Sequence, residues 1–281
     1  PLTAGTNFYY AWQGCTSLTS FLATDLDSGT NFTGAWYGCT QLESFPALDL
    51  SSGTNFSSAW YGCSDASFTS FPVVTFSTTA SDDINFHQAW YGCTAFTSFP
   101  ALDLSRGWNF TTCWGNCSGL TSFPSDITFS TDPSDNLVFN YTWVSCHSLT
   151  SFPALDLSRG TNFAQAWWNC SSLVSFPSGI NISSGTKFTS TWLSCIALTT
   201  FPAGIFDDWS PASVTTGCFQ DAWGSCNVLT EQSVENILLS ISASGVWATS
   251  TGTSSGTALA GREITIGATN SNVNVDNLSA S

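Results

Sequence analysis

The stretch from Asn31 to Thr54 is NFTGAWYGCTQLESFPALDLSSGT, and variants of it recur through most of the 281-residue chain. Its most regular feature is a tryptophan three residues before a cysteine, which occurs nine times. The pairs are Trp12 with Cys15, Trp36 with Cys39, Trp60 with Cys63, Trp90 with Cys93, Trp114 with Cys117, Trp143 with Cys146, Trp167 with Cys170, Trp192 with Cys195 and Trp223 with Cys226. Successive cysteines are 24, 24, 30, 24, 29, 24, 25 and 31 residues apart, so the base period is 24. This period predicts a repeat solenoid, in which each unit buries its apolar face only by stacking on its neighbours.

The first half of the quoted stretch has its apolar residues at helical spacing. Phe32, Ala35, Trp36 and Cys39 fall at i, i+3, i+4 and i+7. This spacing predicts a short helical segment with these four side chains facing inward.

The second half alternates as a strand does. Leu48 and Leu50 flank Asp49, which predicts a short strand with the leucines on one face and the aspartate on the other. The segment from Ser51 to Thr54 follows, and its glycine predicts a turn with a positive backbone dihedral. Each coil is thus expected to hold one strand, one turn and one short helical segment.

The predicted fold class is an α/β repeat solenoid of about nine stacked, leucine-rich-repeat-like coils of roughly 24 residues, over residues 1–229. Residues 230–281 form a second region. Thr230 is placed to cap a helix that runs to about Ile241, and this helix is expected to close the C-terminal end of the stack. The Ser/Thr/Gly-rich tail that follows alternates between Glu263 and Val275, which predicts a strand that folds back or pairs with a neighbouring molecule.

Composition narrows the possible partners. The net charge is −15, and the only cationic residues are Arg106, Arg159, Lys187 and Arg262, so nucleic acid is excluded as a natural partner. No apolar run of 18 residues is present, so we expect no membrane insertion. With 13 Trp and 22 Phe but only 8% charged residues, aromatic packing is expected to hold the fold together. The start at Pro1 inside a repeat, with no methionine in the chain, favours a processed product or a trimmed segment.

The 11 cysteines are expected to be free thiols. Equivalent cysteines in adjacent coils would lie nearly 5 Å apart, beyond the roughly 3.5–4.5 Å between Cβ atoms that a disulfide prefers. We therefore predict a buried ladder of thiols that act as small apolar residues. Cys113 and Cys218 stand outside the ladder, and a local disulfide between Cys218 and Cys226 is the alternative to simple substitution within the pattern.

Two repeated polar positions are candidate ligand or modification sites. The position of Asp49 is expected to form a column of Asp25, Asp49, Thr75, Asp103, Thr128, Asp156 and Asn181, which is either a solvated face or, less favoured, a metal array. No cofactor is expected. Asn31, Asn55 and Asn109 match the glycosylation pattern, although an asparagine at one position of every coil also suits a repeated turn.

The repeat resembles a known family. AWYGC at Ala35 to Cys39, followed by LESF at Leu42 to Phe45, is similar to the A-F-x-x-C and L-x-x-I elements of BspA-like leucine-rich repeats of microbial surface proteins. The likeness covers roughly residues 1–230, with Trp where the family has Phe and with Phe-Pro added before the strand. The resemblance implies a solenoid at a cell surface or on a virion, with an adhesive or decorating role.

Several exposed features are candidates for contact with partners. Tyr37, Tyr61, Tyr91, Trp108 and Trp168 lie outside the core positions and are a possible binding surface, although packing between coils explains them equally well. The insertions at residues 76–83 and 129–136 are expected on one face, as binding loops or as plain lengthened turns. The first coil has no polar cap, which favours stacking on another copy or on another segment.

No catalytic constellation is evident in the sequence, so we expect no enzymatic activity. The leading hypothesis is an extracellular structural and adhesive repeat protein, such as a surface appendage, filament subunit or virion fibre component, that forms homo-oligomers. The alternative is a module that recognises a glycan or protein through the solenoid face or the inserted loops.

Overall fold

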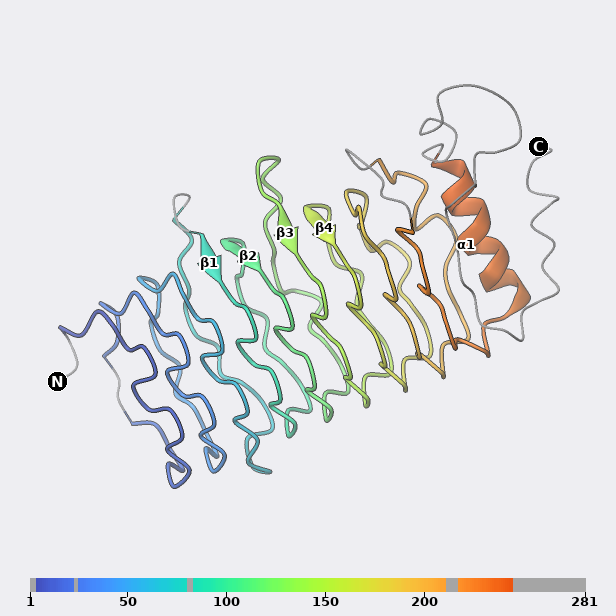
Figure 1. The fold of residues 1–281 in the computed structure, drawn as a ribbon. Coiled ribbons are helices and arrows are strands. Elements are labelled where there is room, and N and C mark those ends of the chain that lie inside the picture. Colours follow the sequence, from blue (N-terminus) through green and yellow to red (C-terminus); the bar gives the residue numbers. More distant parts are fainter. Residues whose placement is uncertain (1–3, 23–24, 80–82, 211–216, 245–281) are drawn as a thin grey trace.

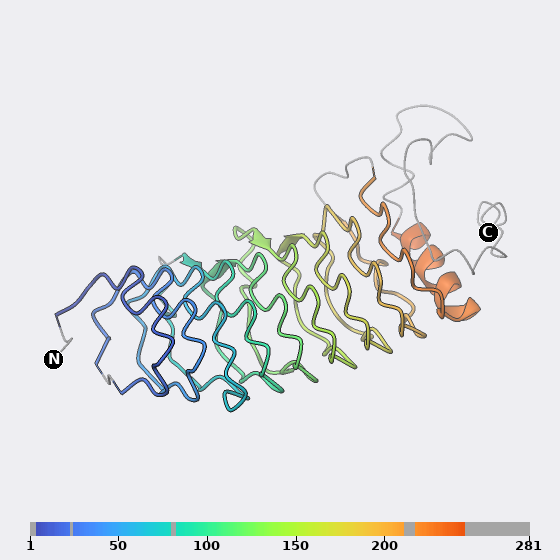
Figure 2. The same ribbon diagram turned by 60° about the horizontal axis from the view of Figure 1, so that its bottom comes forward.

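The computed structural model describes residues 4–22, 25–79, 83–210 and 217–244. Successive turns of the chain lie side by side along an elongated body, with the N-terminal turns at one end and a helix at the other (Figures 1 and 2). The sheet has four parallel strands in the order β1-β2-β3-β4. They are β1 (Ile84–Asn85), β2 (Gly107–Asn109), β3 (Leu137–Val138) and β4 (Gly160–Asn162). The result is a repeat-like α/β architecture in which equivalent positions of the sequence repeat pair with one another. We call each turn of the chain a layer.

The sheet begins at the glycine that ends the predicted turn. The turn itself is present, because Gly107 N–H and Gly160 N–H each donate to the leucine carbonyl three residues back at 2.8 Å. β2 and β4 start at these glycines, and neither Gly107 nor Gly160 has a positive φ, so the predicted positive dihedral was wrong. The glycine is needed for space, because a Cβ on Gly160 would lie 2.3 Å from Cζ of Phe163. Isolated parallel bridges continue the sheet at the asparagine position, from Asn7 to Asn31 and onward.

The strand predicted at Leu48 to Leu50 is reduced to single bridges. Asp49 pairs with Thr75, and the equivalent pairs are Asp103 with Thr128 and Asp156 with Asn181. Leu48 and Leu50 are buried while Asp49 is exposed, so the alternation of faces is as the sequence predicts.

The segment predicted to be helical is a series of tight turns. Ala35 N–H and Cys39 N–H donate three residues back, to the carbonyls of Phe32 (3.0 Å) and Trp36 (3.2 Å). Alternate amides donate instead to the next layer, as Trp36 N–H does to Ala59 O at 2.8 Å and Gly38 N–H does to Tyr61 O at 2.7 Å. An α-helix would commit every amide to the residue four positions earlier. The predicted helix was therefore wrong, because half of the amides bind the neighbouring layer.

This alternation requires left-handed residues at regular intervals. Gly34 and Gly38 have φ of 59° and 70°. In the following layers the position of Gly38 still holds glycine in Gly62 and Gly92, whereas the position of Gly34 holds non-glycine residues, including Ser58 at 55° and Thr112 at 57°. Such residues cost roughly 1–2 kcal/mol each, and the inter-layer hydrogen bonds that their amides make offset that cost.

The core consists of three columns of stacked rings. The first holds the nine repeat tryptophans, with neighbouring ring centroids 5.0–5.9 Å apart and planes within 11°. The second holds Phe8, Phe32, Phe56, Phe86, Phe110, Phe139, Phe163, Phe188 and Phe219. The third holds Phe21, Phe45, Phe71, Phe99, Phe123, Phe152, Phe176 and Phe201. The third column meets the tryptophans edge to face, as in Phe45 against Trp36 at 81°. Each such pair adds about 0.5–1.5 kcal/mol beyond burial alone.

The predicted C-terminal helix is confirmed. Helix α1 spans Glu231–Ala243, and the Thr230 side chain accepts from Ser233 N–H at its start. The apolar stripe of Val234, Ile237, Leu238 and Ile241 is buried against the last layers. The predicted tail strand lies outside the described residues.

Candidate functional site

The repeat tryptophans and cysteines form the interior of the molecule. Eight tryptophans, from Trp36 to Trp223, are fully buried, and so are the matching eight cysteines from Cys39 to Cys226. The first pair differs from this pattern: Trp12 is only partly buried and Cys15 is exposed. The expectation of a uniformly buried column was therefore wrong at its first member, because no described layer covers that side of it.

Each buried thiol has a definite partner. Cys39 Sγ donates to Trp12 O at 3.1 Å, and Cys226 Sγ donates to Trp192 O at 3.0 Å. The six thiols between them bind the tryptophan carbonyl of the preceding layer in the same way. Burial raises the pKa of Cys39 to about 11 and that of Cys170 to about 12. These thiols therefore act as hydrogen-bonded struts between layers, because a nucleophile needs the thiolate.

Cys113 and Cys218 are buried and are not in a disulfide, so the alternative of a disulfide between Cys218 and Cys226 is not realised. Burial raises the pKa of Cys113 well above its usual range. Cys113 occupies the alanine position of the repeat, where Thr142 and Thr191 each donate a hydroxyl to the phenylalanine carbonyl of an earlier layer at 2.9 Å.

Burial of the tryptophan side chains carries an energetic cost at the indole N–H group. Within the described residues, Nε1 of the eight buried repeat tryptophans has no hydrogen-bond partner. An unpartnered buried donor costs about 1–3 kcal/mol. The ring stacking and the burial of each indole outweigh this cost.

The repeated asparagines close local turns. Oδ1 of Asn31 accepts from Thr33 N–H at 3.1 Å, and Asn55 and Asn109 make the same bond to the residue two positions on. Their side chains are half-buried. The arrangement accounts for the repetition of asparagine without a glycan, and glycosylation stays a prediction.

The aspartate position is built from hydrogen bonds. Partial burial raises the pKa of Asp103, but hydrogen bonds from Ser105 and from the Thr128 hydroxyl (3.0 Å) lower it by more, so the net pKa is depressed. In the part of the chain that the structure describes, no group of three or more His, Cys, Asp or Glu side chains is placed to hold a metal ion.

The exposed aromatic residues do not form one surface. Tyr37, Tyr61 and Tyr91 are half-buried and stack in a row, with centroids 4.5 and 4.8 Å apart. Trp108 is 41% exposed and lies on β2, away from this row in the repeat. Trp168 meets Tyr141 edge to face at 6.5 Å. The tyrosine row is thus a ladder between layers, whereas Trp108 is the aromatic side chain that is most open to a partner among these five.

The two inserted loops are held by arginines that the sequence reasoning missed. Arg106, one layer after the first loop, lies 3.8 Å from the carboxylate of Asp83. Arg159, one layer after the second, donates to the carbonyls of Pro133 and Asp135. Residues 80–82 of the first loop lie outside the described residues. The S-R-G sequences at 105–107 and 158–160 were the available signal, since both follow a long insertion.

One serine lies next to a histidine. Ser171 Oγ is 3.4 Å from His147 Nδ1, because both residues follow the repeat cysteine in adjacent layers. Among the described residues, no carboxylate is hydrogen-bonded to His147 to orient it, as catalysis by such a pair requires.

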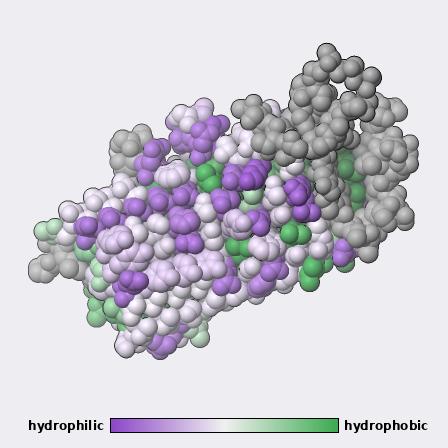
Figure 3. Space-filling view, viewed as in Figure 1, coloured by the Kyte–Doolittle hydropathy of each residue, from purple (hydrophilic) through white to green (hydrophobic). Residues whose placement is uncertain are grey.

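The first layer has an open face, which we call the first-layer face. The carbonyls of Asn31, Thr33, Ala35 and Tyr37 accept amides of the preceding layer at 2.7–2.8 Å. The equivalent carbonyls of the first layer, in Asn7, Tyr9, Ala11 and Gln13, have no donor among the described residues. Trp12 is partly buried and Phe8 is buried, and among the described residues each stacks on an equivalent ring only in the second layer. Hydrophobic residues are visible at this end in Figure 3. The face therefore presents part of the Trp12 ring and a row of acceptors.

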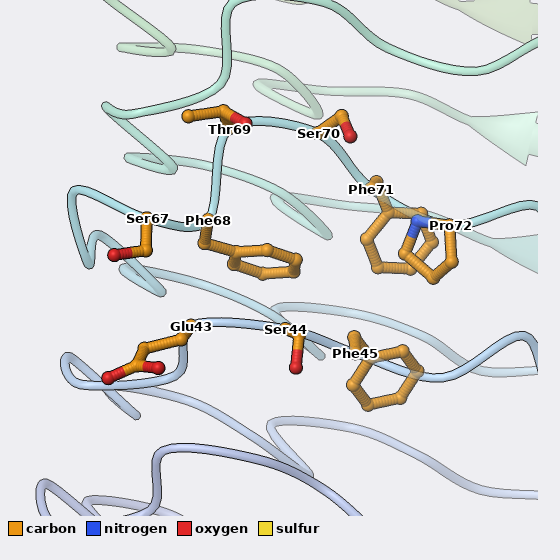
Figure 4. Close-up of a pocket in the computed structure, with 9 residues that line it drawn as sticks. All are labelled: Glu43, Ser44, Phe45, Ser67, Phe68, Thr69, Ser70, Phe71 and Pro72. Atoms are coloured by element: carbon orange, nitrogen blue, oxygen red, sulfur yellow. The ribbon is translucent and has the colours of Figure 1, made fainter.

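A cleft of about 280 Å³, which we call the Glu43 cleft, lies between residues 43–45 of one layer and 67–72 of the next (Figure 4). Phe68 reaches into the gap, and the side chains of Glu43 and Ser67 lie at its outer side. The available sequence signal was the four residues between Cys63 and Phe68, where Cys39 and Leu42 are separated by two.

Comparisons with protein-family models, with curated proteins and with solved structures find no match. Within the described residues, no helix is both long enough and apolar enough to cross a bilayer.

Proposed function

We propose that this chain is a non-enzymatic, extracellular structural and adhesive repeat protein, displayed as a surface appendage, filament subunit or virion fibre component. In this proposal residues 1–229 form a solenoid of about nine coils akin to the BspA-like leucine-rich repeats. The support is the recurrence of one bonding scheme: parallel bridges between equivalent positions, three ring columns and a thiol strut between consecutive layers. Such a body is stiff along its length, which suits a spacer or fibre.

The observation that carries the association of copies is the first-layer face. Its carbonyls, which have no donor among the described residues, and its partly buried Trp12 ring match what every other layer offers to its neighbour. Helix α1 covers the opposite end, so direct head-to-tail stacking of two described bodies would first have to displace it. The tail after Ser244, with the alternation of Ile264 and Ile266, is the segment of a second copy that would supply donors, in the manner of strand addition.

Sedimentation velocity over a wide concentration range, with negative-stain electron microscopy, tests this association. Cys15→Arg places a long cation on the first-layer face without disturbing a buried contact, because Cys15 is exposed. The matched control is Ile196→Arg on the side of the body, since Ile196 is 58% exposed. We expect oligomers for the parent chain and the control, and monomers for Cys15→Arg. Monomers at every concentration for all three proteins would contradict the proposal.

The tail has its own test. Replacing Ile264 and Ile266 by Asp should abolish association if the tail of one copy covers the first-layer face of another. Unchanged oligomers in this double variant, together with monomers for Cys15→Arg, would place the contact on another segment.

The second candidate function is recognition of a glycan or protein by the side of the body. The exposure of Trp108 on β2 favours it, because an exposed indole is a common stacking surface for a partner. A Trp108→Ala variant that binds a glycan array or the host surface as well as the parent chain would remove the part of this proposal that depends on Trp108.

A further inference from the structure

The Glu43 cleft coincides with a break in an otherwise continuous ladder. One amide per layer donates to the carbonyl at the same repeat position in the layer before, at 2.8–3.4 Å. The bonds run from Glu43 to Thr19, Thr97 to Thr69, Thr121 to Thr97, Thr150 to Thr121, Val174 to Thr150, Thr199 to Val174 and Thr230 to Thr199. The missing step is from Thr69 to Glu43, because Thr69 N–H donates to Ser67 O of its own layer at 2.9 Å. Across the described residues, the carbonyl of Glu43 is left without a donor.

The break has a local cause in the sequence. Two extra residues after Cys63 make a turn of their own, in which Asp65 Oδ1 accepts from Ser67 N–H at 2.8 Å and Asp65 O accepts from Phe68 N–H at 3.0 Å. This turn draws the strand-like segment at residues 69–71 out of register with residues 43–45. The parallel bridge that joins Ser20 to Ser44, and Ser70 to Ser98, is absent between Ser44 and Ser70; it is also absent between Ser98 and Ser122, but there the amide bond from Thr121 to Thr97 is kept.

The cleft is lined with polar groups that the protein itself does not use. Ser44, Ser67, Thr69 and Ser70 are exposed, and within the described residues their hydroxyls and the Glu43 carboxylate make no hydrogen bond. Phe68 lies between the two segments as an apolar base (Figure 4). Hydroxyls, one carboxylate and an aromatic ring are the groups that bind a polyhydroxylated ring, because each sugar hydroxyl both donates and accepts.

Size and charge select among such ligands. A volume of about 280 Å³ lies just below the 300–1,000 Å³ of typical drug-sized sites and suits a single ring. The net charge of −15 and the carboxylate of Glu43 disfavour anionic sugars.

We propose that the Glu43 cleft binds one neutral hexopyranose, either free or as a terminal residue of a glycan. The carboxylate of Glu43 and the free carbonyl of the same residue accept from the sugar hydroxyls, and the serine and threonine hydroxyls complete the contacts. The site does not depend on the association of copies, because it lies between later layers and away from the first-layer face.

Saturation-transfer NMR on the full chain tests the site. The probes are the methyl glycosides of glucose, galactose and mannose, with N-acetylneuraminic acid and tetraalanine as anionic-sugar and peptide comparisons. We expect transfer to at least one neutral glycoside, with a dissociation constant on the order of millimolar, and none to the comparison ligands. Glu43→Gln should weaken binding about tenfold or more, because it removes a charge-assisted acceptor. Glu231→Gln, on the exposed first turn of α1, is the matched control and should bind like the parent chain.

A deletion tests the cause of the cleft. Removing Asp65 and Ala66 leaves Cys-Ser-Ser-Phe, which copies the Cys-Ser-Ser-Leu spacing of Cys170 to Leu173. The deletion should restore the bond from Thr69 to Glu43 and abolish glycoside binding while the protein stays folded. No transfer from any neutral glycoside to the parent chain, or transfer that survives both Glu43→Gln and the deletion, would overturn the proposal. Binding of only the peptide or the anionic sugar would overturn it too. Glu43→Gln decides the question alone if the deletion variant does not fold.

Discussion

The two ends of the row of layers differ in how their backbone polar groups are paired. At the C-terminal end, α1 replaces the missing layer with side chains: Ser233 Oγ donates to Thr199 O (3.1 Å), and Asn236 Nδ2 donates to Phe201 O (2.9 Å). Ser240 Oγ accepts from Phe206 N–H at 2.7 Å and donates to Asp207 at 2.8 Å. At the N-terminal end, the carbonyls of the first-layer face have no such partners among the described residues.

This difference shows what must be covered at the end of a row of layers. Covering the aromatic rings is not enough, because the backbone hydrogen bonds between layers also end in a row of polar groups. The positions of Ser233, Asn236 and Ser240 at i, i+3 and i+7 put their polar atoms on one face of α1, where they bind the backbone of residues 199, 201 and 206.

Truncating a repeat tryptophan should lower the free energy of unfolding far more at the C-terminal end, which α1 covers, than at the first-layer face. Trp223 is fully buried and stacks on Trp192 at 5.0 Å, so Trp223→Ala should lower the free energy of unfolding by about 3–5 kcal/mol. Trp12 is only partly buried, so Trp12→Ala should cost roughly half as much or less, in proportion to the area removed from water. Urea unfolding followed by circular dichroism measures both. Equal losses would show that the first layer is as well covered as the last.

Removing one polar contact of α1 should have the next largest effect. Ser240→Ala leaves Phe206 N–H without its acceptor in a buried place, which costs about 1–3 kcal/mol. Hydrogen exchange at the Phe206 amide should accelerate along with the loss of stability. Ser242→Ala is the control, because Ser242 is exposed on the same helix and should leave both measurements unchanged. If the two variants behave alike, the helix closes the end through its apolar stripe alone.

The N-cap of α1 should contribute less to the free energy of unfolding than the Ser240 contact does. Thr230→Ala removes the side-chain acceptor of Ser233 N–H at 3.2 Å, and loss of a cap costs about 1 kcal/mol. Faster amide exchange should be confined to the first turn of the helix. Thr230→Ser should retain parent-like exchange, since its hydroxyl can make the same bond. A loss of protection across the whole helix would mean that the cap also fixes how the helix docks.

The rate of thiol alkylation should differ between the two ends of the unsubstituted protein. Iodoacetamide at pH 8 should alkylate Cys15, which is exposed, in the folded protein at concentrations low enough to keep it monomeric. Cys39 should resist, because burial raises its pKa to about 11 and its thiolate becomes populated only as the pH approaches that value. Cys226, with a pKa raised to about 12, should resist more strongly. Peptide mass spectrometry reads out the modified sites, and early labelling of Cys226 would mean that α1 leaves the end transiently.

The regular part of the molecule was predictable from the sequence. The inward stripe of Phe32, Ala35, Trp36 and Cys39 is buried as predicted, since burial depends on spacing and hydrophobicity. The helix after Thr230 was predictable because its cap and its stripe are both local signals. The turn conformation of the stripe was not, because helical spacing alone does not show that every second amide binds the neighbouring layer.

The candidate sites were less predictable, since they arise where the repeat is broken. The five exposed aromatic residues were identified, but three of them stack into a ladder and do not form an open platform. The Glu43 cleft depends on a two-residue insertion that shifts a neighbouring layer, and its polar residues have no unusual sequence of their own. A register shift between layers is a three-dimensional fact that pattern matching along one layer does not reveal.

The ladder has a consequence for how this protein can change over generations. Each layer bonds mainly to its immediate neighbours, so duplicating or losing a whole unit creates a junction like those already present. Arg106 and Arg159 each bind an inserted loop that belongs to the preceding layer. A layer with an inserted loop is therefore best gained or lost together with the layer that supplies the arginine. The length of the body can therefore change in steps of whole layers, while the first-layer face and helix α1 stay as they are.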